Sequence, residues 1–244
     1  MALLQRIVLL GTGTDVGKTY VAAQLCKAWR ASMGPVLALK PIESGMNLEN
    51  DAALPPESDA GTLEAAATTG AVPLYTFRDP ISPHLAARRE NRTIELAEIS
   101  QWVLQKEAAF LESHGPALQE GSKCLSLVES AGGAFSPVTP TLTNVDLANT
   151  LAPSIVVLIA PDSVGVLHDV TATLRAMPLQ APDLVVLSGA RPADATTGTN
   201  GPELMNIVFP FLGSLAPKNP RVCHVKRDGD AHELARVVRA MSAD

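Results

Sequence analysis

Residues 11–19 read GTGTDVGKT and lie between the apolar run RIVLL (6–10) and the helical run YVAAQLCKAW (20–29). A glycine-rich segment that leaves a strand and opens a helix can direct backbone N–H groups and the positive helix end at phosphate oxygens. In such loops the lysine reaches the β- and γ-phosphates and the threonine hydroxyl binds magnesium. We therefore predict these roles for Lys18 and Thr19, with a turn that binds no ligand as the alternative.

The spacing within this phosphate loop (residues 11–19) differs from the common form. Four residues usually separate the first glycine from the Gly-Lys pair, whereas five separate Gly11 from Gly17 here. The loop is therefore damaged, a chance match, or a different loop with its own function.

Composition indicates a folded domain. Apolar residues make up 46% of the 244 residues and charged residues 18%, which excludes extensive disorder and allows a large core. We find no repeat or linker and expect one domain over 1–244. The net charge of −6 disfavours nucleic acid as a partner, and no stretch has the pattern of a membrane span.

The cysteines and the first residues predict the compartment. The three cysteines are far apart and form no CxxC pair, so we expect buried thiols in a reducing cytoplasm. The first ten residues run into the phosphate loop without a basic lead or a cleavage site, and we expect a strand there rather than a signal peptide.

Short apolar runs that do not alternate with polar residues are typical of strands buried on both faces. Such runs occupy 7–10, 35–40, 124–129, 154–160, 183–189 and 211–216. Helical patterns are expected over 17–32, 94–112, 163–177 and 230–242. The alternation predicts a three-layer α/β fold, with a mostly parallel sheet flanked by helices on both faces. The polar stretches 46–58 and 190–203 are expected to be long loops at the ligand-binding edge of the sheet.

Two stretches after the second strand carry candidate site residues. In KPIESG (40–45), Lys40 is either a second cation beside transferring phosphoryl oxygens or a solvated lysine in a tight turn. In ESDA (57–60), Ser58 or Asp59 caps the following helix, or Asp59 binds a metal ion.

Two later stretches complete the set. In SPHLAA (82–87) a serine cap and a proline predict a short helix, on which His84 either touches a ligand or packs. In VESAGG (128–133), Glu129 is either a magnesium ligand opposite Thr19 or simply the end of a strand. The glycines that follow allow backbone to approach a ligand closely.

In this order the stretches GTGTDVGKT, KPIESG, SDA, SPHLAA and VESAGG resemble the motif set of the dethiobiotin synthetase family. The resemblance is firm over about residues 5–150 and loose beyond. The loop of that family also has five residues before the Gly-Lys pair, so the spacing here is a family trait. The resemblance implies a phosphate-loop NTPase fold.

The resemblance also implies an activity. The family is a ligase of biotin biosynthesis that joins CO2 to 7,8-diaminopelargonic acid with ATP and Mg²⁺, giving dethiobiotin, ADP and phosphate. It further implies a homodimer with the diamine sites at the interface. Here residues 132–147 and the segment after Ser82 are expected to contribute to that interface.

Residue roles follow from the same resemblance. Lys18, Lys40 and Ser44 are the expected catalytic residues, with Lys40 neutralising the carbamate and the γ-phosphate and Ser44 bonding the carbamate or its amine. Asp15 lies near the γ-phosphate or the reacting amine. The expected nucleotide site comprises Gly13, Thr14, Asp15, Val16, Gly17, Lys18, Thr19 and Glu129. The diamine site comprises Lys40, Ser44, Ser82, His84 and Gly132, and the Mg²⁺ site Thr19, Asp59 and Glu129.

Three stretches depart from the family pattern. An asparagine that reads adenine is replaced by Ser188 or Gly189 in VVLSGARP, which leaves the base preference open, and Pro217 in FLGSLAP is expected beside the base. His168-Asp169 stands where the family often has Asn-His, and Ser130 where it often has glycine.

Three other functions are also compatible with a phosphate loop. A partitioning-type ATPase switch usually carries an extra lysine early in the loop, and none precedes Gly17 here. An amide-forming ligase of cobalamin synthesis needs a glutamine-hydrolysing domain, for which the chain is too short. A nucleotide-binding module without activity is disfavoured by the retained residues Lys18, Thr19, Lys40, Asp59 and Glu129.

Overall fold

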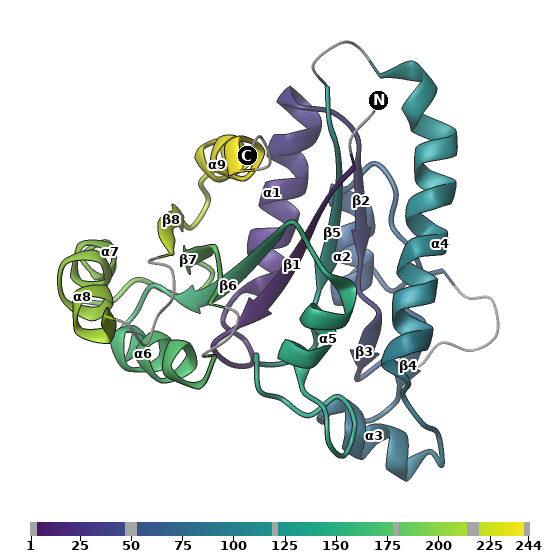
Figure 1. The fold of residues 1–244 in the computed structure, drawn as a ribbon, viewed down its shortest axis with the longest axis horizontal. Helices are drawn as coiled ribbons and strands as arrows, with labels where there is room; N and C mark the ends of the chain where they lie inside the picture. The colour runs from purple at the N-terminus through teal and green to yellow at the C-terminus, as the bar shows by residue number, and fades with distance from the viewer. Residues whose placement is uncertain (1–3, 47–52, 119–121, 178–180, 214–219, 242–244) are drawn as a thin grey trace.

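The apolar runs of the sequence form the centre of one parallel sheet. The computed structural model describes residues 4–46, 53–118, 122–177, 181–213 and 220–241. The sheet has six strands in the order β2-β5-β1-β6-β7-β8 (Figure 1). Their bounds are β1 Leu4–Gly11, β2 Val36–Leu39, β5 Cys124–Glu129, β6 Ile155–Pro161, β7 Leu184–Ser188 and β8 Arg221–Val225. All pairings between these strands are parallel, as predicted.

Helices cover both faces of the sheet, which confirms the predicted three layers (Figure 1). One face packs against α1 Lys18–Ser32, α2 Asp59–Ala66 and α9 His232–Met241. The other packs against α3 Pro83–Arg89, α4 Leu96–His114, α5 Asn144–Leu151 and α6 Val166–Ala176. In β6, Val156 and Leu158 face one core while Val157 and Ile159 face the other. Burial on both sides explains why the strands are apolar throughout.

The chain order places the first strand at the centre of the sheet. β1 pairs with β5 on one side and with β6 on the other, and both of these follow it by more than a hundred residues. The strand order reverses at β1, and in open α/β sheets ligands bind at the carboxyl edge beside such a reversal. At the opposite edge, Arg6 forms a two-pronged ion pair with buried Glu107 of α4.

A small second sheet lies beside the carboxyl edge and was not predicted. It consists of β3 Ile42–Ser44 and β4 Tyr75–Phe77, paired in parallel with Glu43 opposite Thr76. Three-residue strands carry too little periodicity to be read from sequence. The prediction of a turn and loop after Lys40 therefore missed an ordered element.

The strand predicted over 211–216 is wrong. The chain there continues a helical segment of α7 Asn200–Glu203, a π-helical stretch Leu204–Val208 and α8 Phe209–Leu212, and residues 214–216 lie outside the described residues. The last strand is β8 instead. Leu204, Val208 and Leu212 pack into the core at helical spacing, and this segment also shortens the loop expected over 190–203.

Other predictions of the fold are confirmed. The helices predicted from periodic patterns correspond to α1, α4, α6 and α9 within a few residues, and those predicted after ESDA and within SPHLAA to α2 and α3, whereas α5 was missed. A 3₁₀ turn, Gly115–Ala117, follows α4. The three cysteines are buried free thiols. Every helix in the part of the chain that the structure describes is too short or too polar to cross a membrane.

Candidate active site

The phosphate loop leaves β1 at Gly11 and enters α1 at Lys18. Gly17 precedes the helix in the left-handed region, with φ of 91°. A Cβ atom at this position would also overlap the Oγ of Ser188 at the end of β7. Both the backbone conformation and the close packing therefore require glycine at position 17.

Lys18 lies within the loop that it was predicted to serve. Its side chain is buried, and its Nζ lies 3.4 Å from the carbonyl oxygen of Gly13. Burial lowers its pKa and Lys40 adds to that effect, while Glu129 opposes it. The ammonium group thus lies at the helix N-terminus with few hydrogen-bond partners in the protein, which suits a residue that binds a phosphate.

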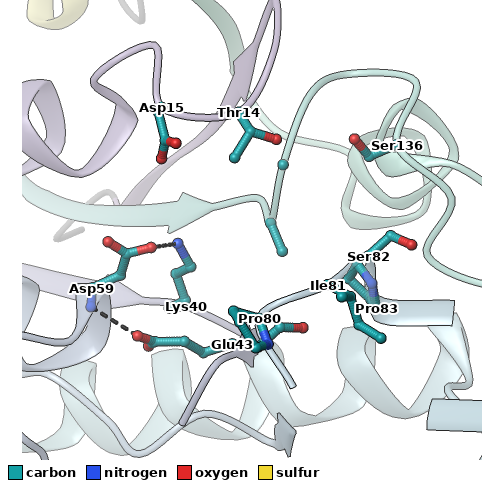
Figure 2. Close-up of a pocket in the computed structure, with 13 residues that line it drawn as sticks. Thr14, Asp15, Lys40, Glu43, Asp59, Pro80, Ile81, Ser82, Pro83 and Ser136 are labelled. Carbon is teal, nitrogen blue, oxygen red and sulfur yellow. Dashed lines mark hydrogen bonds and ion pairs between the residues drawn. The ribbon is translucent and has the colours of Figure 1, made fainter. Parts of the chain in front are cut away.

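Four residues from separate elements converge next to this lysine. The Oγ1 of Thr19 in α1 lies 2.7 Å from Oδ1 of Asp59 in α2 and 2.8 Å from Oε1 of Glu129 in β5. The Nζ of Lys40, which follows β2, forms an ion pair with Asp59 (Figure 2). It forms a second ion pair with Oε1 of Glu129 at 2.7 Å. The four predicted residues therefore form one cluster.

Lys40 is not the solvated lysine of the alternative interpretation. Lys40 is only 4% exposed, and Glu129 is fully buried. Burial opposes the charge on Lys40, but the carboxylates of Glu129 and Asp59 outweigh it and raise the pKa of Lys40. Burial likewise acts to raise the pKa of Asp59, but Lys40 and the Thr19 hydroxyl hold it below its usual value. The pair is therefore fully charged at neutral pH.

The donor set at this cluster fits Mg²⁺. The single proton of the Thr19 hydroxyl is shared between two carboxylate oxygens, and the buried Oε2 of Glu129 has no hydrogen-bond partner among the described residues. Groups of three or more acidic, histidine or cysteine side chains are absent from the described residues. Two carboxylates and a hydroxyl are nevertheless hard oxygen donors of the kind Mg²⁺ takes alongside water and substrate phosphates.

Two cavities meet at this cluster. One of about 310 Å³ lies over the phosphate loop. The other, of about 390 Å³, extends from Lys40 to the start of α3 (Figure 2). They share the lining residues Thr14, Asp15, Lys40, Asp59 and Gly132. A nucleotide phosphate and a second small molecule can therefore meet beside Lys40.

The second cavity contains several of the predicted diamine-site residues. Ser44, Ser82 and Gly132 line it, and the Oγ of Ser44 is buried without a hydrogen-bond partner among the described residues. Such an unpaired buried hydroxyl costs free energy unless a ligand satisfies it. His84 does not line this cavity; its Nδ1 lies 3.2 Å from the Oγ of Ser82.

Sequence reasoning missed the residues that hold the glycine-rich wall of this cavity. The Nδ2 of buried Asn144, at the start of α5, donates to the carbonyls of Ala131 at 2.6 Å and of Gly133 at 2.8 Å. The N–H of Gly133 donates to the Oγ of Ser136 at 2.9 Å. An asparagine at the start of an unpredicted helix gave no signal of this role.

The start of α2 resolves the capping question and adds another missed residue. Ser58 is the N-cap, because its Oγ accepts a hydrogen bond from the N–H of Gly61 at 3.0 Å, and the Asp59 side chain is left for the cluster. The carboxylate of Glu43 accepts hydrogen bonds from the N–H groups of Asp59 and Ala60 at 2.8 and 2.9 Å. Burial raises the pKa of Glu43.

The far end of the site is built differently. Ser188 is buried against Gly17, accepts a hydrogen bond from the N–H of Ala190 at 3.2 Å, and does not line the two cavities. A third cavity of about 290 Å³ lies at the ends of β7 and β8. Arg191, which helps to line it, donates from Nε to the carbonyl of Asp15 at 3.1 Å. Pro217 lies outside the described residues.

His168 and Asp169 are exposed on α6. They stand apart from the residues that line the three cavities described above. Ser130 is buried behind the glycine-rich wall, and its Oγ has no hydrogen-bond partner among the described residues.

Comparison with known proteins assigns the family. The model of the AAA domain family matches residues 5–209. The chain is 32% identical over 188 residues to the ATP-dependent dethiobiotin synthetase BioD of Methylobacterium nodulans, covering 74% of this chain and 78% of that protein. It is 33% identical over 195 residues to the enzyme of the same name from Caulobacter vibrioides, covering 75% and 80%. For that of Anaeromyxobacter dehalogenans the values are 30% over 232 residues, covering 92% and 95%.

A solved structure supports the fold alone. The ParA family ATPase from Chlorobium tepidum TLS superposes with a TM-score of 0.51 at 12% identity, covering 99% of this chain and 91% of that one. The sequence match over residues 5–209 and this topology agree on a phosphate-loop NTPase. The chain therefore belongs to the AAA domain family, and ATP-dependent dethiobiotin synthetases are among its relatives.

Proposed function

We propose that the protein is an ATP-dependent dethiobiotin synthetase, a ligase that carboxylates 7,8-diaminopelargonic acid and closes its urea ring. The observation that carries the proposal is the junction of the two cavities at Lys40. A nucleotide switch needs only the cavity over the phosphate loop. A ligase needs a second one, open to the γ-phosphate and lined by groups that can hold a small polar substrate.

The first chemical step joins CO2 to one amine of the substrate. The amine nitrogen forms a bond to the carbon of CO2 and loses a proton, which gives a carbamate. Ser44, with its unpaired buried hydroxyl, is placed to hydrogen-bond that group. Lys40 lies at the junction and supplies positive charge where the carbamate meets the γ-phosphate.

The second step activates the carbamate. A carbamate oxygen bonds to the γ-phosphorus, the bond from phosphorus to the β–γ bridging oxygen breaks, and ADP leaves. Catalysis of such a transfer is chiefly positioning and charge neutralisation. Lys18 and the backbone of the phosphate loop hold the phosphates. The second amine then attacks the carbamoyl carbon, loses a proton and expels phosphate as the ring closes.

Thr19, Asp59 and Glu129 are the residues that would hold Mg²⁺ in this proposal. The ion supplies additional neutralisation of phosphate charge when it is bound. Asp59 and Glu129 also hold Lys40 by ion pairs. The same two carboxylates thus set the position of the lysine and serve the metal site.

We place the nucleotide base at the third cavity, at the ends of β7 and β8. Gly189 and Lys226 line it, and the Tyr20 hydroxyl donates to the carbonyl of Lys226 at 2.8 Å, which connects this edge to α1. β8 ends at Val225, so Lys226 directly follows this strand. This position suggests a weak preference among bases, because the expected asparagine is absent from the strand end.

We further propose a homodimer. Phe135 and Leu142 are 40% and 37% exposed in the segment expected at the interface, next to the second cavity. Contiguous exposed apolar surface marks protein interfaces, and pairing of two copies through this segment would cover both side chains. Sedimentation equilibrium tests this: a mass twice that of the chain supports it, and a monomer at high concentration contradicts it.

The deciding experiment measures phosphate release from ATP with Mg²⁺ and bicarbonate, with and without 7,8-diaminopelargonic acid, and identifies the product by mass. Release that requires the diamine, with a product gaining one carbonyl in place of two hydrogens, supports the synthetase. Phosphate release indifferent to the diamine but stimulated by a protein partner or DNA would favour an ATPase switch instead.

A further inference from the structure

We propose that Glu43 is a positioning residue that sets the backbone of Asp59 and so holds its carboxylate ready for the metal ion and Lys40. This inference rests on the proposed function, since it assigns Asp59 to the Mg²⁺ site. It goes further because the sequence assigns no role to Glu43, although the residue lies within KPIESG, and because its carboxylate acts on the cluster through the backbone of Asp59.

Both carboxylate oxygens of Glu43 accept a hydrogen bond. The residue is 6% exposed. Its Oε1 accepts the N–H of Asp59 at 2.8 Å and its Oε2 accepts the N–H of Ala60 at 2.9 Å. Figure 2 shows the carboxylate directed at the Asp59 backbone, with the Asp59 side chain turned to Lys40. The carboxylate therefore points to the start of α2, although Glu43 lines the second cavity.

Capping α2 does not require Glu43. The helix already has an N-cap in Ser58, whose side chain accepts the N–H of Gly61. What Glu43 adds is the pair of hydrogen bonds to the first two helical residues. One of these residues is Asp59, which joins the cluster with Thr19 and Lys40. A charged acceptor here fixes the backbone from which a metal-ligating carboxylate extends, the role that outer-shell partners take at metal sites.

The short strand β3 links this contact to the rest of the site. Glu43 is the middle residue of the strand and is held in register opposite Thr76 of β4. Lys40 lies three residues before it and Ser44 directly after it. One short segment thus carries Lys40, Glu43 and Ser44. In this proposal Glu43 orients Asp59, which is the ion-pair partner of Lys40. The strand fixes their relative positions together.

The test compares two variants that weaken the same helix end. Glu43→Gln removes the charge and can turn an amide N–H₂ toward a backbone N–H, so one of the two hydrogen bonds is lost. Ser58→Ala removes the N-cap but leaves the N–H of Asp59 bound to Glu43. Glu64→Gln changes an exposed carboxylate on the same helix and controls for charge alone. Thermal unfolding measures how much each variant loosens the fold.

The decisive readout is metal binding without turnover. Mn²⁺ binding to the protein with ADP is measured by electron paramagnetic resonance, with no diamine present. We expect Glu43→Gln to weaken Mn²⁺ binding by about tenfold, the lower range for loss of an outer-shell partner, and Ser58→Ala and Glu64→Gln to change it less than about twofold. In turnover assays Glu43→Gln should raise the Mg²⁺ concentration needed for half activity far more than it lowers kcat.

Two results would overturn the proposal. One is unchanged Mn²⁺ binding in Glu43→Gln; the other is equal weakening in Glu43→Gln and Ser58→Ala, which would make Glu43 a helix cap only. Should Glu43→Gln fail to fold, Glu43→Asp, which withdraws the carboxylate by one methylene, carries the same comparison. If wild-type protein lacks diamine-dependent turnover, the proposed function fails, but the Mn²⁺ comparison still decides the role of Glu43.

Discussion

The two ends of the site lie on the same edge of the sheet but differ in the residues that form them. Beside the ends of β1, β2 and β5, charged side chains converge, and buried Lys40 forms ion pairs with buried Glu129 and with the partly exposed Asp59. At the other end of the site, β7 ends at Ser188, whose side chain packs against Gly17. Gly189 follows it and packs against the backbone of Lys226 and Arg227, just after β8. The first end is specified by buried ion pairs, whereas the cavity at the second has a longer contact, 3.7 Å between Nδ1 of His224 and Oδ2 of Asp162.

This difference indicates which end of the site tolerates substitution. A cluster of buried, mutually dependent charges tolerates little change, because removing one partner leaves another unpaired in a low-dielectric site. A cavity lined largely by exposed and half-buried residues imposes fewer requirements on its occupant. We therefore expect chemistry to be strict at the first end and base selection to be permissive at the second.

Removing the central charge should have the largest effect. Lys40→Met keeps much of the side-chain volume but leaves the fully buried Glu129 without its cation. Loss of one group that stabilises a developing oxyanion costs about 10²–10³ in kcat. Single-turnover phosphate release measures this, with circular dichroism as the control for folding. A folded variant within tenfold of wild-type kcat would contradict the assignment of Lys40.

The contact between the two ends provides the next prediction. Gly17→Ala places a Cβ against the Oγ of Ser188 and strains the left-handed backbone at φ of 91°. We expect ADP binding to weaken by about tenfold, equivalent to about 1.4 kcal/mol. Isothermal titration calorimetry measures this loss.

The double variant Gly17→Ala, Ser188→Gly separates the two causes of that loss. Removing the Ser188 side chain relieves that contact but leaves the Cβ of Ala190 at 2.8 Å and the backbone strain, so affinity should recover only in part. If the second substitution restores nothing, the packing of Ser188 on the phosphate loop does not connect the two ends.

Acid stability provides a third, smaller effect. Lys40 holds the pKa of Asp59 below its ordinary value of 3.8, against the effect of burial. Asp59 therefore contributes stability above about pH 4, and this contribution is lost as the pH falls through the lowered folded value. In Lys40→Met the opposing charge is gone, so Asp59 should protonate at higher pH. Circular dichroism during acid titration should show the variant unfolding at a higher pH than wild type; coincident curves would contradict the coupling.

The smallest effect is expected when the base is exchanged. With the strand-end asparagine replaced, kcat/KM for CTP and GTP should stay within about a hundredfold of the value for ATP, because sites that reject analogues more strongly use dedicated hydrogen-bonding groups. Gly189→Asn should not create an adenine preference, since a Cβ there would overlap the backbone N of Arg227. A strong preference for ATP in the wild type would contradict the weak base selection expected at the ends of β7 and β8.

Sequence reasoning succeeded where the pattern was local. The phosphate loop, α1 and the central strands follow from spacing and from apolar runs that the structure confirms. The residues of the charged cluster were each named, but their contacts cross 19 to 110 positions of sequence. From KPIESG alone, a solvated Lys40 was a reasonable alternative, and only the fold excludes it.

The failures have physical causes. The apolar run FLGSLA was read as a strand, although its first two residues end a helix that packs through Leu204 and Val208. Short apolar runs do not distinguish the two structures. Glu43 and Asn144 were missed because their partners are backbone groups, and a sequence does not show which N–H or carbonyl lies nearby.

The central position of β1 has a consequence for how the protein is made. The strand that carries the phosphate loop is synthesised before the other strands of its sheet, yet its neighbours β5 and β6 emerge more than a hundred residues later. At about 5–20 residues per second, the apolar strand waits for several seconds without its native neighbours. During that time it presents unpaired backbone groups to other chains. Slowing translation between β2 and β6 should therefore increase aggregation of the newborn chain without altering the finished protein.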